Sequence, residues 1–295
     1  MKTKPLTIAQ FFKQFPDDET CLQHLFDVRF GQGHVCPKCE RASKWFRIKA
    51  ERAFSCQFCG HHIHPTVGTP FAKTRTPLQS WFYAIFLFTT TRNGVAAKEL
   101  QRQLGVTYKT AWRMAGLIRE HMANVDGDYR IGGEGTVVEA DETFIGGEAR
   151  GKGSGYKKNK KVVFGMLERG GDVVTEVVDN RSARALLPHV AKHVERGGEI
   201  HTDEFGGYGD LPIHGYNHKR VNHSAGQYVV NGVGVNAIEG FWAQLKRMVS
   251  GTHIHVSGKH LWKYAKEAEY RFNRRQCPEG MLPELLGTFP PLNAE

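Results

Sequence analysis

The stretch Val137-Val138-Glu139-Ala140-Asp141-Glu142-Thr143-Phe144-Ile145 places acidic side chains within an apolar run that is typical of a β-strand. Burying a carboxylate costs free energy unless a cation or hydrogen bonds compensate for the lost water, which makes Asp141 a candidate functional residue. Further strand-like runs follow at 161–167, 172–178 and 199–202, and a helical pattern lies at 186–194. This mixed order of strands and helices predicts an α/β domain with a layered sheet.

Two more acids have a setting that surface acids lack. Asp203 follows the strand-like run 199–202, and Glu239 lies on the amphipathic helical segment 236–247. Two carboxylates from strands and one from a helix can converge on a pair of divalent cations that serve phosphodiester transfer. Because all the ligands are oxygens, Mg2+ or Mn2+ suits them better than Zn2+. Each acid taken alone also fits an ordinary surface residue, so the interpretation depends on the three together.

Four of the six cysteines form two pairs, Cys36-Pro-Lys-Cys39 and Cys56-Gln-Phe-Cys59, with sixteen residues between them. Two such turns complete a tetrahedral four-thiolate site, so residues 31–70 are predicted to form a zinc ribbon with one structural Zn2+. Two redox CxxC motifs are the alternative, but no thioredoxin-like βαβ pattern surrounds them. Four nearby histidines could also replace a thiolate: His34, His61, His62 and His64.

The composition narrows the class of partner. The chain has 295 residues, a formal net charge of +10 and a pI near 9.3, so nucleic acid is the first partner to consider. Basicity that serves only solubility is the alternative. The longest apolar run, 81–88, has eight residues, whereas a transmembrane helix needs about 20, and the N-terminal segment lacks the apolar stretch of a secretory signal. We therefore expect a soluble, cytoplasmic protein.

The segments on either side of the ribbon are expected to be helical. Apolar residues recur at helical spacing in 1–30 and again in 71–125. In the second segment two helices flank Gly105, which favours a helix-turn-helix. The N-terminal end of its second helix would then offer candidate DNA contacts. A plain helical hairpin is the alternative, because Gln101 stands where a small residue is usual. The candidate contacts are Tyr108, Lys109 and Arg113.

These motifs together resemble those of one family. The chain is similar, nearly from end to end, to bacterial insertion-sequence transposases of the zinc-ribbon DDE group, which is related to the eukaryotic Merlin elements. Thirty-five residues separate Asp203 from Glu239, the separation typical of DD(35)E enzymes. Some relatives have asparagine as the third catalytic residue, whereas this chain has Glu239. The matching pieces are the four-cysteine ribbon, Glu139–Gly147, His201–Glu204, Asn222–Ser224, Asn236–Trp242 and Tyr270–Arg275.

The resemblance implies a fold, an activity and cofactors. It implies a ribonuclease H-like catalytic domain over 131–277, followed by a tail at 278–295. Asp141 on the first strand, Asp203 on the fourth and Glu239 on the following helix would be catalytic and would hold two Mg2+ or Mn2+ ions. The implied DNA transposase binds the terminal inverted repeats of its element and catalyses metal-dependent strand cleavage and strand transfer. It would act on double-stranded DNA in the nucleoid, as a dimer or higher oligomer, because two ends must be brought together.

The closing segment is the strongest candidate for a surface that follows DNA phosphates, since 241–275 contains eight Lys or Arg residues and two acids. Trp242 could stack on an unpaired base, with packing in the core as the favoured alternative. A glycine-rich basic loop at 150–161 is a further candidate, and a solvated hairpin is the alternative there. The basic candidates of the closing segment are Lys246, Arg247, Arg271, Arg274 and Arg275.

Two other functions share parts of this pattern. A junction resolvase would use the same catalytic core, but it would not need a zinc ribbon and a helix-turn-helix, and strand-transfer products would exclude it. A non-enzymatic DNA-binding regulator would not need an acid inside an apolar strand, and metal-dependent nicking would exclude it.

Overall fold

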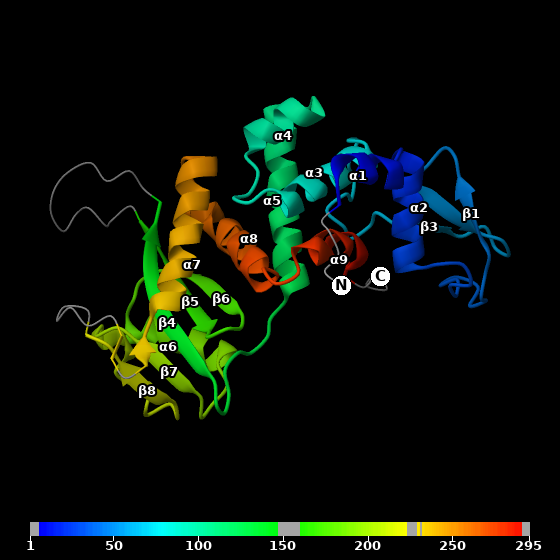
Figure 1. Cartoon of the computed structure of the whole chain (residues 1–295). Coiled ribbons are helices and arrows are strands. Elements are labelled where there is room, and N and C mark those ends of the chain that lie inside the picture. Colours follow the sequence, from blue (N-terminus) through cyan, green and yellow to red (C-terminus); the bar gives the residue numbers. More distant parts are fainter. Residues whose placement is uncertain (1–5, 147–159, 223–228, 231, 291–295) are drawn as a thin grey trace. The chain divides into compact units, whose positions relative to one another are not determined.

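The computed structural model describes residues 6–146, 160–222, 229–230 and 232–290. The chain divides into two compact units (Figure 1). The first, called here the front unit, consists of residues 1–121 together with 277–295, and the second, the sheet unit, consists of residues 122–276. Within the described ranges, no helix is long and apolar enough to cross a membrane.

The front unit begins with helices whose starting points are set by side-chain caps. Thr7 accepts a hydrogen bond from a first-turn amide of α1 (Ile8–Gln14), and Asp17 does the same for α2 (Asp18–Arg29). The third helix, α3 (Leu78–Thr90), is buried on nearly every side, as its almost continuously apolar sequence requires. The helical character expected for 1–30 and for the start of 71–125 is therefore present.

Two helices also lie on either side of Gly105. α4 (Ala97–Leu104) ends at Gly105, which has a φ of 64°, a conformation that glycine adopts without strain. α5 (Tyr108–Asp126) follows, and the hydroxyl oxygen of Thr107 accepts a hydrogen bond from the amide of Thr110 at 3.2 Å. The boundary between the two units falls within α5. The pair of helices is present, whereas DNA binding by this pair stays a prediction.

The segment expected to be a tail forms a helix instead. α9 (Met281–Gly287) turns four apolar side chains into the front unit and packs against α2 and α3. Ring nitrogens of His24 and His121 lie 3.1 and 2.8 Å from the carbonyl oxygens of Leu286 and Leu285. These contacts satisfy carbonyl groups that the end of a helix leaves without partners. The apolar side chains of α9 thus belong to the core of the front unit.

Three short strands form the ribbon within the front unit. β1 (Trp45–Ile48), β2 (Ala53–Cys56) and β3 (His62–Ile63) make an antiparallel sheet in that order. The ring of Phe54 on β2 stacks on the ring of Phe26 on α2, with centroids 4.1 Å apart. The ribbon is therefore joined to the helices by aromatic packing as well as by the chain.

The sheet unit contains a five-stranded sheet in the order β6-β5-β4-β7-β8. The chain first forms three antiparallel strands and then adds two parallel strands on the other side of β4. Asp141 lies on the first of these strands and Asp203 directly follows the fourth, which are the positions that the resemblance implies. The strands are β4 (Val137–Ile145), β5 (Lys161–Glu168), β6 (Val173–Val178), β7 (Glu199–Thr202) and β8 (Asn217–Arg220).

Helices cover both faces of this sheet. α7 (Asn236–Arg247) and α8 (Leu261–Asn273) pack on one face, and α6 (Ala183–His193) packs on the other. Because side chains alternate along a strand, β5 turns Val163 toward α7 and Phe164 toward α6. The same alternation divides β4, so its odd-numbered residues 139 and 141 face α7.

Other parts of the sheet unit differ from the sequence pattern. β8 consists of Asn-His-Lys-Arg and shows no apolar alternation, because an edge strand can leave both of its faces to solvent. α7 ends at Arg247, and a π-helical turn continues it. The remaining short elements among the described residues of the sheet unit are that π-helical turn (Met248–His253), β9 (Val229–Val230), β10 (Val233–Gly234) and the 3-10 turns Gly206–Tyr208 and Gly258–His260. The front unit also contains the 3-10 turn Pro278–Gly280.

Candidate functional site

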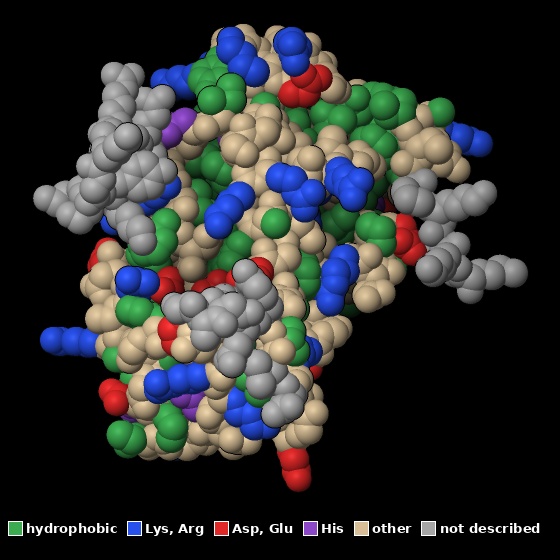
Figure 2. Space-filling model, turned by 60° about the vertical axis from the view of Figure 1, so that its left-hand side comes forward, with side chains coloured by type: hydrophobic (Ala, Val, Ile, Leu, Met, Phe, Trp, Pro, Cys, Tyr) green, Lys and Arg blue, Asp and Glu red, His purple; other side chains and the backbone are tan. Residues whose placement is uncertain are grey.

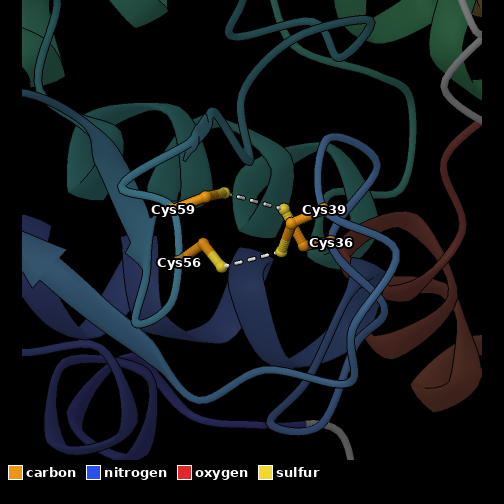
Figure 3. A group of neighbouring side chains, drawn as sticks. All are labelled: Cys36, Cys39, Cys56 and Cys59. Atoms are coloured by element: carbon orange, nitrogen blue, oxygen red, sulfur yellow. Dashed lines mark hydrogen bonds between the residues drawn. The ribbon is translucent and has the colours of Figure 1, made fainter.

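Four cysteine thiols from two tight turns of the front unit point toward one another (Figure 3). The Sγ atoms of Cys36 and Cys59 lie 3.7 Å apart, and those of Cys39 and Cys56 lie 3.8 Å apart. A tetrahedron with Zn–S bonds of about 2.3 Å has edges of about 3.8 Å. The predicted four-cysteine cluster is therefore confirmed, and its spacing fits a zinc ion rather than a disulfide.

The two turns of the ribbon close in the same way. The amide of Glu40 donates to the carbonyl of Cys36 at 2.8 Å, and the amide of Gly60 donates to that of Cys56 at 3.0 Å. Glu40 and Gly60 both have a positive φ, of 56° and 68°. The Ser43 hydroxyl lies 3.2 Å from Cys56 Sγ, where it can orient the thiolate. Among the described residues, the cysteines form the only group of three or more potential metal ligands, and the nearby histidines do not join it.

In the sheet unit, two parallel strands bring two of the predicted acids together. β4 pairs with β7 so that Glu139 lies opposite His201. Two residues further along the same two segments come Asp141 and Asp203, the latter just beyond the end of β7. The negative charge of Asp203 contributes to a raised pKa of Asp141, as is expected of carboxylates that lie close together.

The carboxyl group of Asp141 has a strongly raised pKa. Burial, followed by the charge of Glu142 and then by that of Asp203, raises the pKa of its carboxyl group to about 7. The indole N–H of Trp242 on α7 donates to Oδ2 of Asp141 at 2.9 Å. A buried carboxylate that is repelled by two others is stabilised by a cation, which offsets both effects.

The third predicted acid, Glu239, does not complete a compact group of ligands with the other two. It is on the first turn of α7 and its side chain is exposed. Among the described residues, only the four cysteines form a group of three or more potential ligands whose ligand atoms all lie within 4.8 Å of one another. The described acids therefore do not form a compact set of metal ligands. The structure thus brings Asp141 and Asp203 together and places Glu239 on the helix that covers the same face of β4.

Glu142 points to the opposite face of β4 from Asp141. The hydroxyl group of Tyr208 donates to Oε2 of Glu142 at 2.5 Å, and Arg181 donates to Oε1 at 3.4 Å. Burial raises the pKa of Glu142. The alternation of side chains along a strand therefore separates these neighbouring acids into two environments.

Two further charged groups lie beside this site, the buried Glu139 and the more exposed Arg169. Glu139 is 2% exposed, and its Oε1 accepts a hydrogen bond from Nε of Arg169 at 2.6 Å. The sequence signal for Glu139 is weak: it is a second acid in an apolar strand, on the same face as Asp141. No pattern in the sequence marks Arg169, which lies in the turn after β5.

Several expected DNA contacts have partners inside the sheet unit instead. Trp242 is 3% exposed, so packing in the core, rather than stacking on a base, describes its place in this structure. Arg271 forms an ion pair with the buried Glu267 at 2.9 Å, and Arg274 forms one with the buried Asp126. A guanidinium group that holds a buried carboxylate has few donors left for phosphates.

The remaining basic candidates of the closing segment differ from one another. Arg275 is exposed, but its guanidinium group donates to the carbonyls of Phe272 and Gly171, both at 2.8 Å. Lys246 and Arg247 are exposed on α7. The basic loop expected at 150–161 lies outside the described residues up to position 159.

The expected DNA contacts of the front unit lie on the surface. Tyr108, Lys109 and Arg113 are exposed on α5, and Trp112 between them is 44% exposed. Figure 2 shows that Lys and Arg side chains are spread over the visible face, with acidic side chains among them. The net positive charge is thus distributed rather than gathered into one patch on this face.

Comparison with protein families agrees with the geometry of both units. Residues 16–62 match the family described as a transposase zinc-ribbon domain, and residues 132–273 match the ISXO2-like transposase domain. The two matches cover nearly two thirds of the chain and contain the four cysteines and the three predicted acids. No protein of curated function matches the chain. The chain therefore belongs to the zinc-ribbon DDE transposases.

Proposed function

We propose that this transposase binds the terminal inverted repeats of its insertion sequence, cleaves a phosphodiester bond at the element's end and joins the freed 3′-hydroxyl group to target DNA. One observation carries the proposal. Asp141 on β4 lies close to Asp203, which directly follows the neighbouring parallel strand β7, within the matched transposase domain. Cleavage and joining are both in-line displacements at phosphorus, so one set of carboxylates can serve both steps.

Asp141, Asp203 and Glu239 would hold two Mg2+ or Mn2+ ions. Carboxylate oxygens are the ligands that these hard cations prefer, and the burial and charge repulsion that raise the pKa of Asp141 fit a site that attracts cations. When bound, such a pair of ions activates the attacking oxygen and stabilises the leaving one. The chain itself orients the ligands. Trp242 holds one oxygen of Asp141, and the amide of Phe205 donates to Oδ1 of Asp203 at 2.9 Å.

The front unit would recognise the transposon ends. The ribbon (31–70) has basic surroundings, and α5 would present Tyr108, Lys109 and Arg113 to the edges of the bases. In the sheet unit, Lys246 follows Glu239 by seven residues, so both lie on one face of α7. We therefore assign to Lys246 a contact with the phosphates beside the cleaved bond.

Transposition also sets requirements on assembly. Two transposon ends must be held at once, so we propose that the active complex with DNA contains at least two copies of the chain. The basic net charge supports association with the nucleoid.

The test is incubation of the purified protein with a labelled duplex that carries the inverted repeat, in Mg2+ or Mn2+. We expect a nick at the element's end, followed by strand-transfer products when a target duplex is added. Nicking of branched DNA without strand transfer would favour a junction resolvase. Binding without any metal-dependent nicking would favour a DNA-binding regulator.

A further inference from the structure

The helix that carries Glu239 cannot cap its own N-terminus. The residue at the N-cap of α7 is Val235, whose apolar side chain forms no capping hydrogen bond. The first amides of a helix have no partners within the helix and need an outside acceptor. Oε2 of Glu139, on β4, accepts hydrogen bonds from the amides of Ala237 and Ile238 at 2.8 and 3.1 Å. The cap of α7 is therefore supplied by a strand nearly a hundred residues earlier in the chain.

Arg169 holds the other oxygen of the Glu139 carboxylate. Its Nε donates to Oε1 at 2.6 Å, and its two terminal nitrogens donate to the carbonyls of Gly232 and Gly234 at 2.7 and 2.8 Å. Its Nη2 atom also lies 3.1 Å from Nδ1 of His201, on β7. One guanidinium group thus joins β4, β7 and the segment that leads into α7. We call Glu139 and Arg169 the α7 clamp.

The position of α7 over β4 is also set by close packing. Gly165 lies opposite Asp141 on the neighbouring strand β5. A Cβ atom at Gly165 would stand 2.6 Å from the Trp242 ring and 2.9 Å from a methyl group of Ile238. The helix therefore lies against a strand that leaves no room for a side chain, and a small displacement of α7 would open a gap or create a clash.

We propose that the α7 clamp positions Glu239 relative to Asp141 and Asp203. Glu139 precedes Asp141 by two residues on the same face of β4, and the amides that it binds are the two that precede Glu239 on α7. The clamp thus joins residues that lie one or two positions away from two of the three proposed metal ligands. Glu139 and Arg169 are positioning residues, and this role rests on the proposed function.

The substitution Glu139→Gln separates the two halves of the clamp. A glutamine has the same shape, but its amide group offers one acceptor oxygen and one donor nitrogen. Whichever way it turns, its nitrogen faces either the guanidinium group of Arg169 or the amides of α7, all of which are donors. The substitution also removes a negative charge from the positive end of the helix dipole. The matched control is Val190→Ala, which removes bulk from the core on the α6 face of the sheet.

The test has two readouts. One is amide hydrogen exchange of the first turn of α7 in the protein without DNA, and the other is the Mn2+ concentration that gives half-maximal nicking of the inverted-repeat duplex. For Glu139→Gln we expect exchange to accelerate about tenfold and the Mn2+ requirement to rise by a similar factor. For Val190→Ala we expect both to stay within about twofold of the wild-type values, because Val190 packs on the opposite face of the sheet from α7.

The outcomes separate the two proposals. A wild-type protein that nicks no DNA refutes the proposed function and the positioning role with it. A wild-type protein that nicks, together with a Glu139→Gln protein whose exchange or Mn2+ requirement is unchanged, refutes the positioning role alone. Equal changes in exchange and Mn2+ requirement in the Val190→Ala protein would show that both readouts follow general stability, which also refutes the positioning role. If Glu139→Gln does not fold, Arg169→Lys serves in its place, because lysine keeps the charge but cannot reach all three carbonyl and carboxylate partners. The same rise in the Mn2+ requirement is expected, and an unchanged requirement overturns the proposal.

Discussion

Replacing Asp141 by asparagine should make the metal-free protein more stable at neutral pH, although the residue is proposed to be catalytic. Burial and the charges of Glu142 and Asp203 raise the pKa of Asp141 from 3.8 to about 7. The folded chain therefore keeps this proton up to about pH 7, whereas the unfolded chain releases it near pH 3.8. Asp141 therefore leaves the free energy of unfolding undiminished below about pH 4 and lowers it progressively as the pH rises to about 7. Asparagine keeps a carbonyl oxygen for the N–H of Trp242 and carries no charge at any pH.

The size of the effect follows from the pKa difference. A difference of roughly three between the folded and unfolded states corresponds to ~4 kcal/mol, the most that Asp141→Asn can add to the free energy of unfolding at pH 8. At pH 5 much of this cost is absent, so the gain should be smaller by roughly 2–3 kcal/mol. The measurement is urea unfolding in buffer free of Mg2+ and Mn2+ at both pH values, with hydrogen exchange of β4 and α7 identifying the sheet unit. A variant that is no more stable than the wild type at pH 8, or that gains equally at both pH values, would refute the electrostatic account.

Three further predictions concern zinc and DNA. The wild-type protein should hold one zinc ion per chain by elemental analysis, and Cys56→Ser should lose it and unfold the ribbon while hydrogen exchange of the sheet unit stays unchanged. Lys246→Ala should weaken end binding and reduce the slope of log affinity against log salt by about one, and an unchanged slope would remove Lys246 from the DNA surface. Arg274→Ala should instead lower the free energy of unfolding by ~3 kcal/mol or more, because it leaves the buried Asp126 carboxylate without this partner. An Arg274→Ala protein with wild-type stability and a smaller salt slope would restore Arg274 as a phosphate contact.

The parts of the structure that the sequence predicts are those determined by local spacing. The interval between Cys36 and Cys39 is enough to form one metal-binding turn, and its repetition at Cys56 and Cys59 predicts the whole cluster. The apolar run along 137–145 likewise predicts a strand, and the alternation of side chains along a strand places Asp141 on one face and Glu142 on the other. These properties depend on neighbours in the sequence, so a single chain is enough to read them.

The parts that could not be predicted depend on contacts between distant segments. Nothing near Val235 shows that α7 is capped by Glu139, because the acceptor comes from another strand. Arg274 looks like a surface cation until Asp126 is found beside it, and the polar edge strand β8 shows no apolar alternation. The helix α9 was expected to be a tail, since its few apolar residues gain significance only when α2 and α3 provide a surface for them.

The assignment of Asp141, Asp203 and Glu239 as the catalytic acids is tested most directly by nicking of a labelled inverted-repeat duplex in Mg2+ or Mn2+. We expect Asp141→Asn, Asp203→Asn and Glu239→Gln each to abolish nicking and strand transfer while end binding, followed by gel shift, stays intact. The matched controls Glu142→Gln, on the opposite face of β4, and Glu204→Gln, which is exposed beside Asp203, should keep measurable activity. Robust cleavage by the Glu239→Gln protein would contradict the assignment and would direct attention to Asn236 or Glu204 as the third residue.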